Sequence, residues 1–222
     1  MAEFALDPSF AGLPQTIPVF PLSGVVLLPR GRLPLNIFEP RYLAMVRDAL
    51  ASRDRLIGMI QPLEKETIDP ADRPALYKAG CAGRIIGFNE SEDGRFQIVL
   101  AGLARFDVVE EIVGSTPYRS VAPDWQRYRR DLEDEAGEID RPRMLAGLRD
   151  YFKASGLKAD WSAVEGAPDD RLVTTLAMVC PFQPSEKQAL LESPDLASRA
   201  EIMTALIEMA LAGRGSESQP RH

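Results

Sequence analysis

Proline and glycine interrupt the apolar runs that lie near the N-terminus. Three such runs follow one another, IPVFPL at 17–22, GVVLLP at 24–29 and LPLNIF at 33–38. Because proline has no backbone N–H to donate, it is confined to strand starts, sheet edges and bends. The three runs therefore predict short strands in a small, strongly bent barrel and argue against a flat central sheet.

Helical spacing replaces the strand pattern at residues 40–55, PRYLAMVRDALASRDR. The apolar positions of this segment form one stripe, which predicts a single amphipathic helix. Pro40 suits the first turn, where its missing N–H would have had no partner in any case. The apolar run that follows, LIGMIQ at 56–61, predicts a buried strand.

The clearest hairpin in the chain has its turn at residues 92–94 (EDG), between two β-rich runs. Apolar and polar residues alternate over residues 95–100, which is the period of a half-buried strand. We expect Gly102 to permit a bend, after which residues 105–112 start another strand.

The second half of the chain is helical in pattern. Apolar residues recur at helical spacing in segments 144–156, 169–180, 185–193 and 195–213, and Gly213 marks the end of the last one. The predicted division is an N-terminal extension at 1–16, a β barrel at 17–128, a charged linker at 129–140, a helical subdomain at 141–213 and a disordered tail at 214–222. The sequence therefore predicts an α+β protein.

The formal net charge of −7 opposes binding to phosphate backbones. One local exception is WQRYRR at 125–130, a mixture of rings and cations of the kind that stacks bases and contacts phosphates. Its candidate contact residues are Trp125, Arg127, Tyr128, Arg129 and Arg130. The acidic run DLEDEAGEID at 131–140 follows directly and would offset the arginines. We therefore expect no nucleic-acid binding, and RNA binding by the barrel stands as an alternative.

Most catalytic devices need residues that this sequence lacks. The only histidine is His222, so neither a histidine-based triad nor a histidine metal cluster is predicted. The phosphate-binding patterns G-x-x-x-x-G-K-[ST] and G-x-G-x-x-G are missing. A serine-lysine dyad needs a buried lysine, and the five lysines all sit in polar surroundings that predict exposure: Lys65, Lys78, Lys153, Lys158 and Lys187. We predict no catalytic residue, metal or cofactor, with a small hydrolase of unrecognised site as an alternative.

The sequence also bears on where the protein works. No apolar run approaches the length that spans a bilayer. The first residues, MAEFALDPSFAGLP, lack the basic start and apolar middle of a signal peptide. Cys81 and Cys180 lie far apart in unlike contexts, which predicts two reduced core thiols. We expect a cytoplasmic protein.

Three blocks of sequence resemble the N-terminal domain of Lon proteases, and most closely the small stand-alone Lon N-terminal-like proteins of bacteria. The blocks are FPLSGVVLLPRGRLPLNIFEPRYLAMVRDAL, GCAGRIIGFNESEDGRFQIVLAGLARF and PSEKQALLESPDLASRAEIM, and the resemblance covers about residues 17–212. It implies a PUA-like pseudobarrel with one helix, followed by a helical subdomain. In Lon this region is associated with substrate recognition, upstream of ATPase and peptidase modules, and we expect neither of those activities here.

The resemblance implies a protein-binding module that recognises unfolded or peptide-like segments, or a protease, as an adaptor in protein quality control. The candidate binding residues form the corner between the third apolar run and the helix: Phe38, Glu39, Arg41 and Tyr42. They could hold the backbone of an incoming peptide. A structural role is the preferred interpretation, because strand-to-helix junctions routinely use these residue types. The favoured place for a binding groove is the junction between barrel and helical subdomain.

Overall fold

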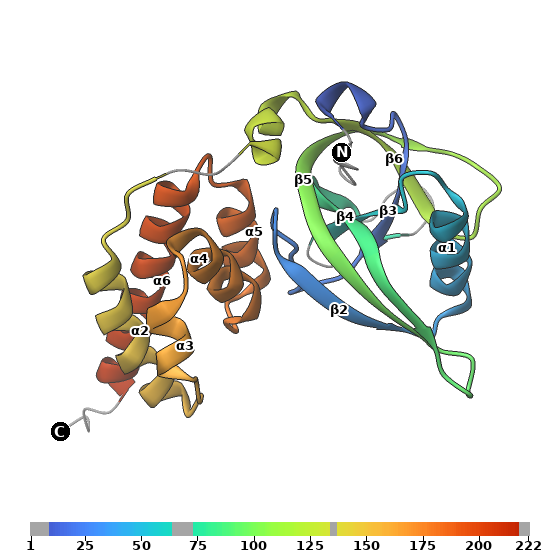
Figure 1. The fold of residues 1–222 in the computed structure, drawn as a ribbon. Helices are drawn as coiled ribbons and strands as arrows, with labels where there is room; N and C mark the ends of the chain where they lie inside the picture. Colours follow the sequence, from blue (N-terminus) through green and yellow to red (C-terminus); the bar gives the residue numbers. More distant parts are fainter. Residues whose placement is uncertain (1–8, 64–72, 134–136, 218–222) are drawn as a thin grey trace, which may run out of the picture.

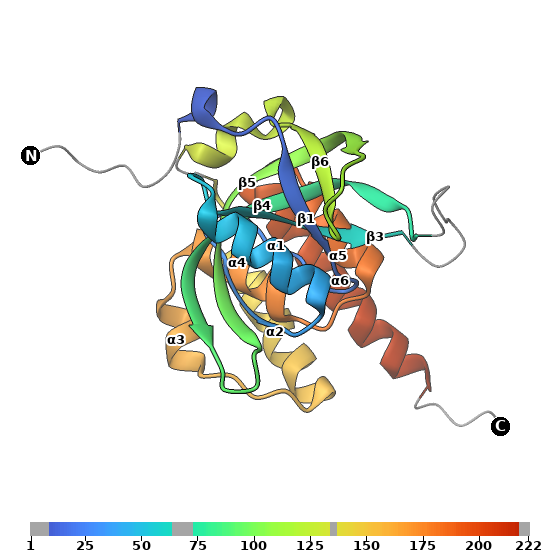
Figure 2. The ribbon, with the colours of Figure 1, turned by 90° about the vertical axis from the view of Figure 1, so that its right-hand side faces the viewer.

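The computed structural model describes residues 9–63, 73–133 and 137–217 (Figure 1). Parts of the predicted extension, linker and tail, residues 1–8, 134–136 and 218–222, lie outside the described residues. A β barrel with one helix forms one part of the molecule and a bundle of α-helices forms the other, which confirms the predicted α+β class. Figure 2 shows the barrel helix at the front and the bundle behind the barrel. Within the described ranges, no helix combines the length and apolar character needed to cross a bilayer.

Six strands form a sheet that closes on itself. They are β1 (Ile17–Pro21), β2 (Arg32–Ile37), β3 (Leu56–Pro62), β4 (Leu76–Glu90), β5 (Phe96–Ile112) and β6 (Arg119–Asp124). The strand order is β2-β5-β4-β3-β1-β6, and an additional pairing of β5 with β6 closes the barrel. The long strand β5 makes closure possible because its first part pairs with β2 and β4 and its last part with β6. Within the described residues, β5 is the only strand neighbour of β2, so β2 keeps an open edge.

The predicted helix and hairpin are both present. Helix α1 (Pro40–Ala51) packs its apolar stripe into the barrel core. In the turn between β4 and β5, Gly94 has a φ of +76°, a conformation that costs glycine nothing because it has no Cβ. The strand expected to start at residue 105 is instead part of β5, which continues past Gly102. The prediction of a separate strand is wrong, because a shift in the β4–β5 register at Gly102 absorbs the irregularity without ending the strand.

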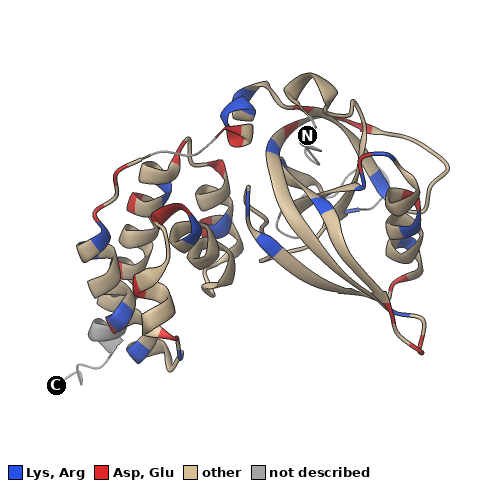
Figure 3. Cartoon of the chain, in the orientation of Figure 1, with Lys and Arg blue, Asp and Glu red and all other residues tan. Residues whose placement is uncertain are grey.

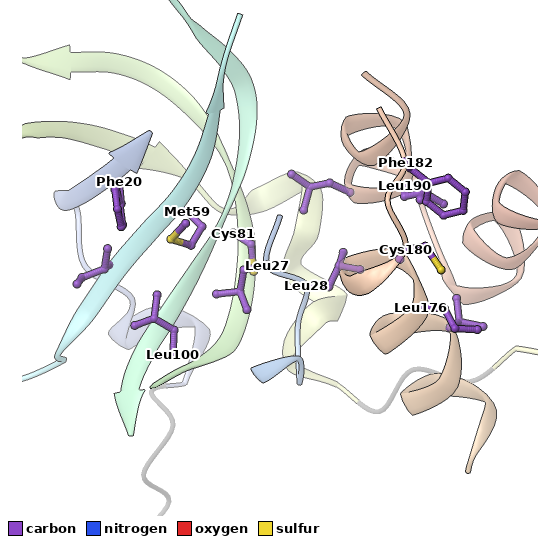
Figure 4. Packing of buried hydrophobic residues seen from close by; sticks show 14 of the residues in the cluster. Phe20, Leu27, Leu28, Met59, Cys81, Leu100, Leu176, Cys180, Phe182 and Leu190 are labelled. Carbon is purple, nitrogen blue, oxygen red and sulfur yellow. The ribbon is translucent and has the colours of Figure 1, made fainter. Parts of the chain in front are cut away.

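The run GVVLLP, predicted as a strand, is a loop: residues 22–31 join β1 to β2 outside the sheet. Leu27 and Leu28 are nevertheless fully buried. Figure 4 shows Leu27 beside the barrel strands, near Cys81, and Leu28 between those strands and the helical bundle. A short apolar run has the same pattern whether a sheet or a packed loop buries it, which is why periodicity assigned it wrongly.

The backbone of this loop is held closely against β5. The N–H of Gly102 donates to the carbonyl of Gly31, and the N–H of Arg30 donates to the carbonyl of Gly102, both at 2.8 Å. A Cβ added to Gly102 would overlap the carbonyl oxygen of Leu28. Glycine is therefore required at position 102 for the loop to approach the strand.

The bundle contains α2 (Arg141–Ser155), α3 (Trp161–Gly166), α4 (Asp169–Val179), α5 (Pro184–Glu192) and α6 (Leu196–Glu217), and the 3₁₀ helices are η1 (Phe10–Gly12) and η2 (Gln126–Leu132). The Asp140 carboxylate caps α2 by accepting from the N–H of Arg143, and Gln183 and Glu186 form a capping box at the start of α5. Helix α3 was not predicted because its six residues are too few to show a period. Helix α6 continues past Gly213, the predicted helix end.

A buried arginine joins the barrel to the bundle. Arg105 on β5 is 2% exposed and pairs with Asp131 of η2, with Nε–Oδ2 and Nη2–Oδ1 distances of 2.9 and 2.7 Å. Its Nη1 donates to the carbonyl oxygens of Leu191 and Ser193, at 2.9 and 2.5 Å. These partners replace the water that the guanidinium loses on burial. The side chain thereby links β5, η2 and the end of α5.

Two glutamines add a second polar link. The Nε2 group of Gln61 on β3 donates to the Pro184 carbonyl at 2.9 Å and to Oε1 of Gln188 at 3.1 Å. The Nε2 group of Gln188 in turn donates to the Ala79 carbonyl of β4 at 3.1 Å. Around these bonds, a single apolar cluster extends from the barrel into the bundle. The two parts therefore share one core.

Replacing Gly102 by alanine will destabilise the fold. The new methyl group must displace the Leu28 carbonyl, so we expect Gly102→Ala to lower the free energy of unfolding by about 2 kcal/mol. Gly114→Ala is the matched control, because its Cβ would meet nothing within 4 Å, and it should change stability by less than about 1 kcal/mol. Denaturant unfolding measures both, and equal effects would contradict the close approach.

Removing the buried guanidinium will cost more than removing an exposed one. Arg105→Met leaves the buried Asp131 carboxylate without its charged partner, and only the backbone N–H of residue 105 still donates to it. The free energy of unfolding should therefore fall by about 3 to 5 kcal/mol. Arg143→Met, which breaks an exposed pair with Glu208, should cost less than about 1 kcal/mol. Adding Asp131→Leu to Arg105→Met should recover part of the loss. Denaturant unfolding of the four proteins checks this, and a double variant less stable than Arg105→Met alone would contradict it.

Candidate protein-binding site

The predicted corner residues divide between two surfaces. Phe38 follows β2 and is 62% exposed, with the Arg95 guanidinium of the hairpin 5.9 Å from the centroid of its ring. Glu39 is the N-cap residue of α1, and its carboxylate accepts a 2.9 Å hydrogen bond from Nε of Arg41. The side chains of this pair are 43% and 54% exposed respectively. Arg41 turns back over the Tyr42 ring, 4.5 Å from its centroid.

Tyr42 is the buried member of the corner. Its ring lies 4.2 Å from the ring of Phe20, centroid to centroid, within the barrel core. Burial raises the pKa of its hydroxyl, and the nearby Arg41 charge only partly opposes this shift. The side chain therefore fixes the start of α1 on the barrel and stays neutral at physiological pH.

Arg41 and Tyr42 line a pocket of about 340 Å³ at the end of the barrel, which we call the mouth pocket. The other lining residues are Pro21, Pro62, Arg73, Pro74, Thr116, Pro117, Tyr118 and Arg119. Arg73 and Arg119 both pair with Glu111, and Nη1 of Arg119 donates to the Pro74 carbonyl at 2.7 Å. Among the described lining residues, three are arginines and none is acidic.

Tyr118 forms one wall of the mouth pocket. Its hydroxyl donates to Oδ2 of Asp48 at 2.7 Å. Burial is the larger cause, and this hydrogen bond to a carboxylate the smaller one, of the raised pKa of Tyr118, which is about 12. Like Tyr42, it therefore presents a neutral ring to the pocket.

A second cavity lies on the part of the sheet formed by β2, residues 85–90 of β4 and residues 96–101 of β5, which we call the arm. Its volume is about 510 Å³, and Figure 3 shows these strands largely in tan toward the hairpin turn. The cavity is lined by Pro34, Leu35, Asn36, Gly87, Phe88, Asn89, Gln97, Ile98 and Val99. Within this described lining no residue is charged and three carry carboxamides. Nδ2 of Asn89 donates to Oε1 of Gln97 at 3.4 Å.

A binding groove was predicted between barrel and bundle, but these two cavities lie elsewhere. The mouth pocket and the arm cavity are each lined by barrel residues alone. Apolar side chains, among them Leu27 and Leu28, fill the junction instead. The physical reason is the shared core, whose side chains occupy the space around Leu27 and Leu28, whereas these two cavities lie on outer surfaces of the barrel.

The structure buries the aromatic residues proposed for stacking RNA bases. The Trp125 ring packs 5.7 Å from Phe106, centroid to centroid, and its Nε1 donates to the Pro14 carbonyl at 3.1 Å. Tyr128 is 3% exposed beneath the guanidinium of Arg127. Base stacking needs exposed rings, so these two residues do not offer a stacking surface.

The remaining three candidates for RNA contact are the arginines of η2. Arg129 lies over the ring of Phe10, 5.0 Å from its centroid, and Arg130 is exposed. Arg127 also pairs with Asp107 at 3.6 Å. Arg127 and Arg129 thus contact neighbouring protein groups, and Arg130 is the exposed cation without a ring partner among the described contacts.

The exposure predicted for Lys187 is wrong. Its side chain is 7% exposed, and its Nζ donates to the Met178 carbonyl in the last turn of α4 at 2.9 Å. Desolvation lowers its pKa, while burial raises the pKa of the nearby Cys180 to about 11. Lys187 thus caps a helix end beside a protonated thiol. In the described residues there is no group of three or more His, Cys, Asp and Glu that could hold a metal ion.

Comparison with known sequences gives the family. A family model described as the ATP-dependent protease La (LON) substrate-binding domain matches residues 16–209, so the chain belongs to that family. It is 28% identical over 198 residues to "Lon protease 2" of Myxococcus xanthus, covering 88% of this chain and 24% of the relative. It is 33% identical over 126 residues to "Lon protease" of Parabacteroides distasonis, covering 55% and 15%. The chain spans about a quarter of the length of Lon proteases such as these.

Solved structures agree with this assignment. A Lon N-terminal domain protein from Xanthomonas campestris superposes with a TM-score of 0.56 at 25% identity, covering 86% of this chain and 97% of that one. The N-terminal domain of the Mycobacterium avium complex Lon protease gives the same TM-score at 15% identity, covering 87% and 98%, which shows a shared fold. The resemblance inferred from the sequence is confirmed.

The corner residues will separate into one that stabilises the fold and two that do not. Glu39→Gln and Arg41→Gln should each change the free energy of unfolding by less than about 1 kcal/mol, because an exposed ion pair contributes little. Tyr42→Ala should lower it by about 3 kcal/mol through the cavity that it leaves. Thermal and denaturant unfolding measure the three variants. A large loss in Arg41→Gln would show that the exposed pair holds the corner.

Proposed function

We propose that the chain is a non-catalytic module that binds extended segments of other polypeptides along the arm. The observation that carries the proposal is the match of residues 16–209 to a substrate-binding domain. The uncharged cavity of about 510 Å³ supports it, because ligand sites are concave and mostly apolar with a few placed polar groups.

Main-chain recognition is the first element of the proposed binding mode. The open edge of β2 can accept a further strand through the backbone groups of its other residues, since Pro34 has no N–H to donate. Such hydrogen bonds do not depend on side-chain identity. Beside it, Asn36, Asn89 and Gln97 each carry a donor and an acceptor, the same pair that a peptide group carries. These features suit segments of varied sequence.

Exposed apolar side chains are the second element. Phe38 beside the arm and Ile86 on β4 are 62% and 49% exposed. Each would bury apolar surface against a side chain of the bound segment. Removing that surface from water stabilises the complex by about 25 cal/mol per Å². A folded protein hides its backbone and its apolar side chains, whereas an unfolded one exposes both. The arm therefore selects unfolded segments.

This selectivity defines the wider role that we propose. A module that binds unfolded segments without cleaving them can act as an adaptor that delivers clients in protein quality control. Its partners would then be unfolded polypeptides and a protease, in the cytoplasm.

A light-activated crosslinker placed on the arm tests the proposal. With benzoylphenylalanine in place of Phe38, the purified protein should crosslink to a reduced, carbamidomethylated protein that cannot fold, and much less to the same protein in its native form. The alkylating group is neutral, so charge does not contribute. The yield is read by gel mobility and mass spectrometry of the crosslinked peptides.

The matched control carries the crosslinker at Met209, which is 69% exposed on α6 in the helical bundle. We expect little client there. Serine at both Phe38 and Ile86 should reduce client capture, whereas serine at both Val179 and Met209 should leave it unchanged. Equal crosslinking at positions 38 and 209 would refute the assignment of binding to the arm.

A further inference from the structure

The geometry points to a second contact on the bound polypeptide: the mouth pocket binds the side-chain carboxylates of an acidic segment. This inference rests on the proposed function and adds a charge preference to it. The pocket lining contains Arg41, Arg73 and Arg119 and, among its described residues, no Asp or Glu. The carboxylates that pair with these arginines, Glu39 and Glu111, lie outside the lining, so the pocket presents guanidinium groups to a ligand in a chain with a net charge of −7.

The three arginines differ in how firmly they are held. Arg119 is fixed, since its side chain is 9% exposed, pairs with Glu111 and donates to the Pro74 carbonyl. Arg41 and Arg73 are 54% and 45% exposed and come from different segments, the start of α1 and the residues before β4. A carboxylate that enters between them meets guanidinium groups from two sides, and such charge-assisted bonds are about twice as strong as neutral ones.

The rest of the lining suits a polypeptide rather than a free ion. Prolines at 21, 62, 74 and 117 contribute apolar surface with no backbone N–H of their own. Tyr42 and Tyr118 add neutral rings, as their hydroxyls remain protonated at physiological pH. A volume of about 340 Å³ is at the lower end of ligand sites. It accommodates an acidic side chain together with the apolar side chain beside it.

An acidic polypeptide is favoured over a nucleic acid by the wider charge distribution. The net charge of −7 repels a polyanion, and the rings of Trp125 and Tyr128 are buried and do not stack bases. Charges more than about 8 Å away are largely screened at physiological salt. A short segment with a few carboxylates therefore experiences chiefly the arginines of the pocket and their partners Glu39 and Glu111, and not the net charge of the whole chain.

The pocket also lies close to the arm along the chain. Phe38 and Arg41 are separated by two residues, so their Cα atoms are at most about 11 Å apart. An extended segment of about four residues covers this distance. The same client can therefore contact the arm with its backbone and the mouth pocket with an acidic side chain.

Peptide binding measured by fluorescence anisotropy tests the inference. The probe is an acetylated, amidated peptide that alternates glutamate with phenylalanine and glycine, compared with the same peptide carrying glutamine. The glutamate peptide should bind about tenfold more tightly, with an affinity that falls as salt is added. Arg41→Gln with Arg73→Gln should remove this difference and leave binding of the glutamine peptide unchanged.

Arg149→Gln with Arg143→Gln is the matched control, since both arginines are exposed and pair with glutamates in the helical bundle, and Arg149 also lies over a ring, that of Trp161. It should keep the preference for the glutamate peptide. If the double variant unfolds, Arg41→Gln alone replaces it, because this single change leaves the Glu111 pairs intact. Arg41→Gln should lose part of the preference for the glutamate peptide.

The outcomes separate the two proposals. Equal binding of the two peptides, or equal losses in the pocket and control variants, would overturn the acidic preference and leave the proposed function standing. Binding of neither peptide would count against both. A single-stranded RNA of equal charge that binds more tightly than the glutamate peptide would replace the acidic polypeptide by a nucleic acid.

Discussion

The buried charge of Arg105 constrains the rest of the structure. A guanidinium that leaves water must regain all of its partners within the protein, or the folded state loses several kcal/mol. Asp131 and two carbonyls at the end of α5 supply them, and they come from segments far apart in the sequence. Barrel, connecting 3₁₀ helix and bundle must therefore reach one relative position together, and the apolar junction around Leu27 and Leu28 closes only in that position.

The filled junction bears on where concave surface remains. Apolar side chains occupy the space around Leu27 and Leu28, and the two cavities described above lie at the barrel end and on the arm. Both surfaces depend on strand β5. Its first part supports β2 and the arm cavity, and its last part carries Glu111, which holds the arginines of the mouth pocket. The same long strand that closes the barrel thus positions both candidate surfaces.

Much of the fold follows from local pattern. The alternation in residues 95–100 and the stripe of α1 were sufficient to predict a strand and a helix, because each buries one face. GVVLLP and Lys187 were predicted wrongly for a common reason: their burial is set by elements other than their own, β5 and α4 respectively. The mouth pocket was beyond sequence analysis for the same reason. Arg41 was a candidate from its place beside a helix, but nothing local relates it to Arg73 or Arg119.

The corner at residues 38–42 shows how stability and binding can be assigned to different side chains. Tyr42 is buried against Phe20, so its ring is needed for the fold whether or not a ligand is present. The Glu39–Arg41 pair is half exposed and adds little to stability, which leaves the Arg41 guanidinium able to exchange Glu39 for a carboxylate of a client. Such an exchange has a small net energy because one ion pair replaces another. In the proposed contact, selectivity would therefore come from the additional contacts with Arg73 and the apolar walls, which Glu39 alone does not supply.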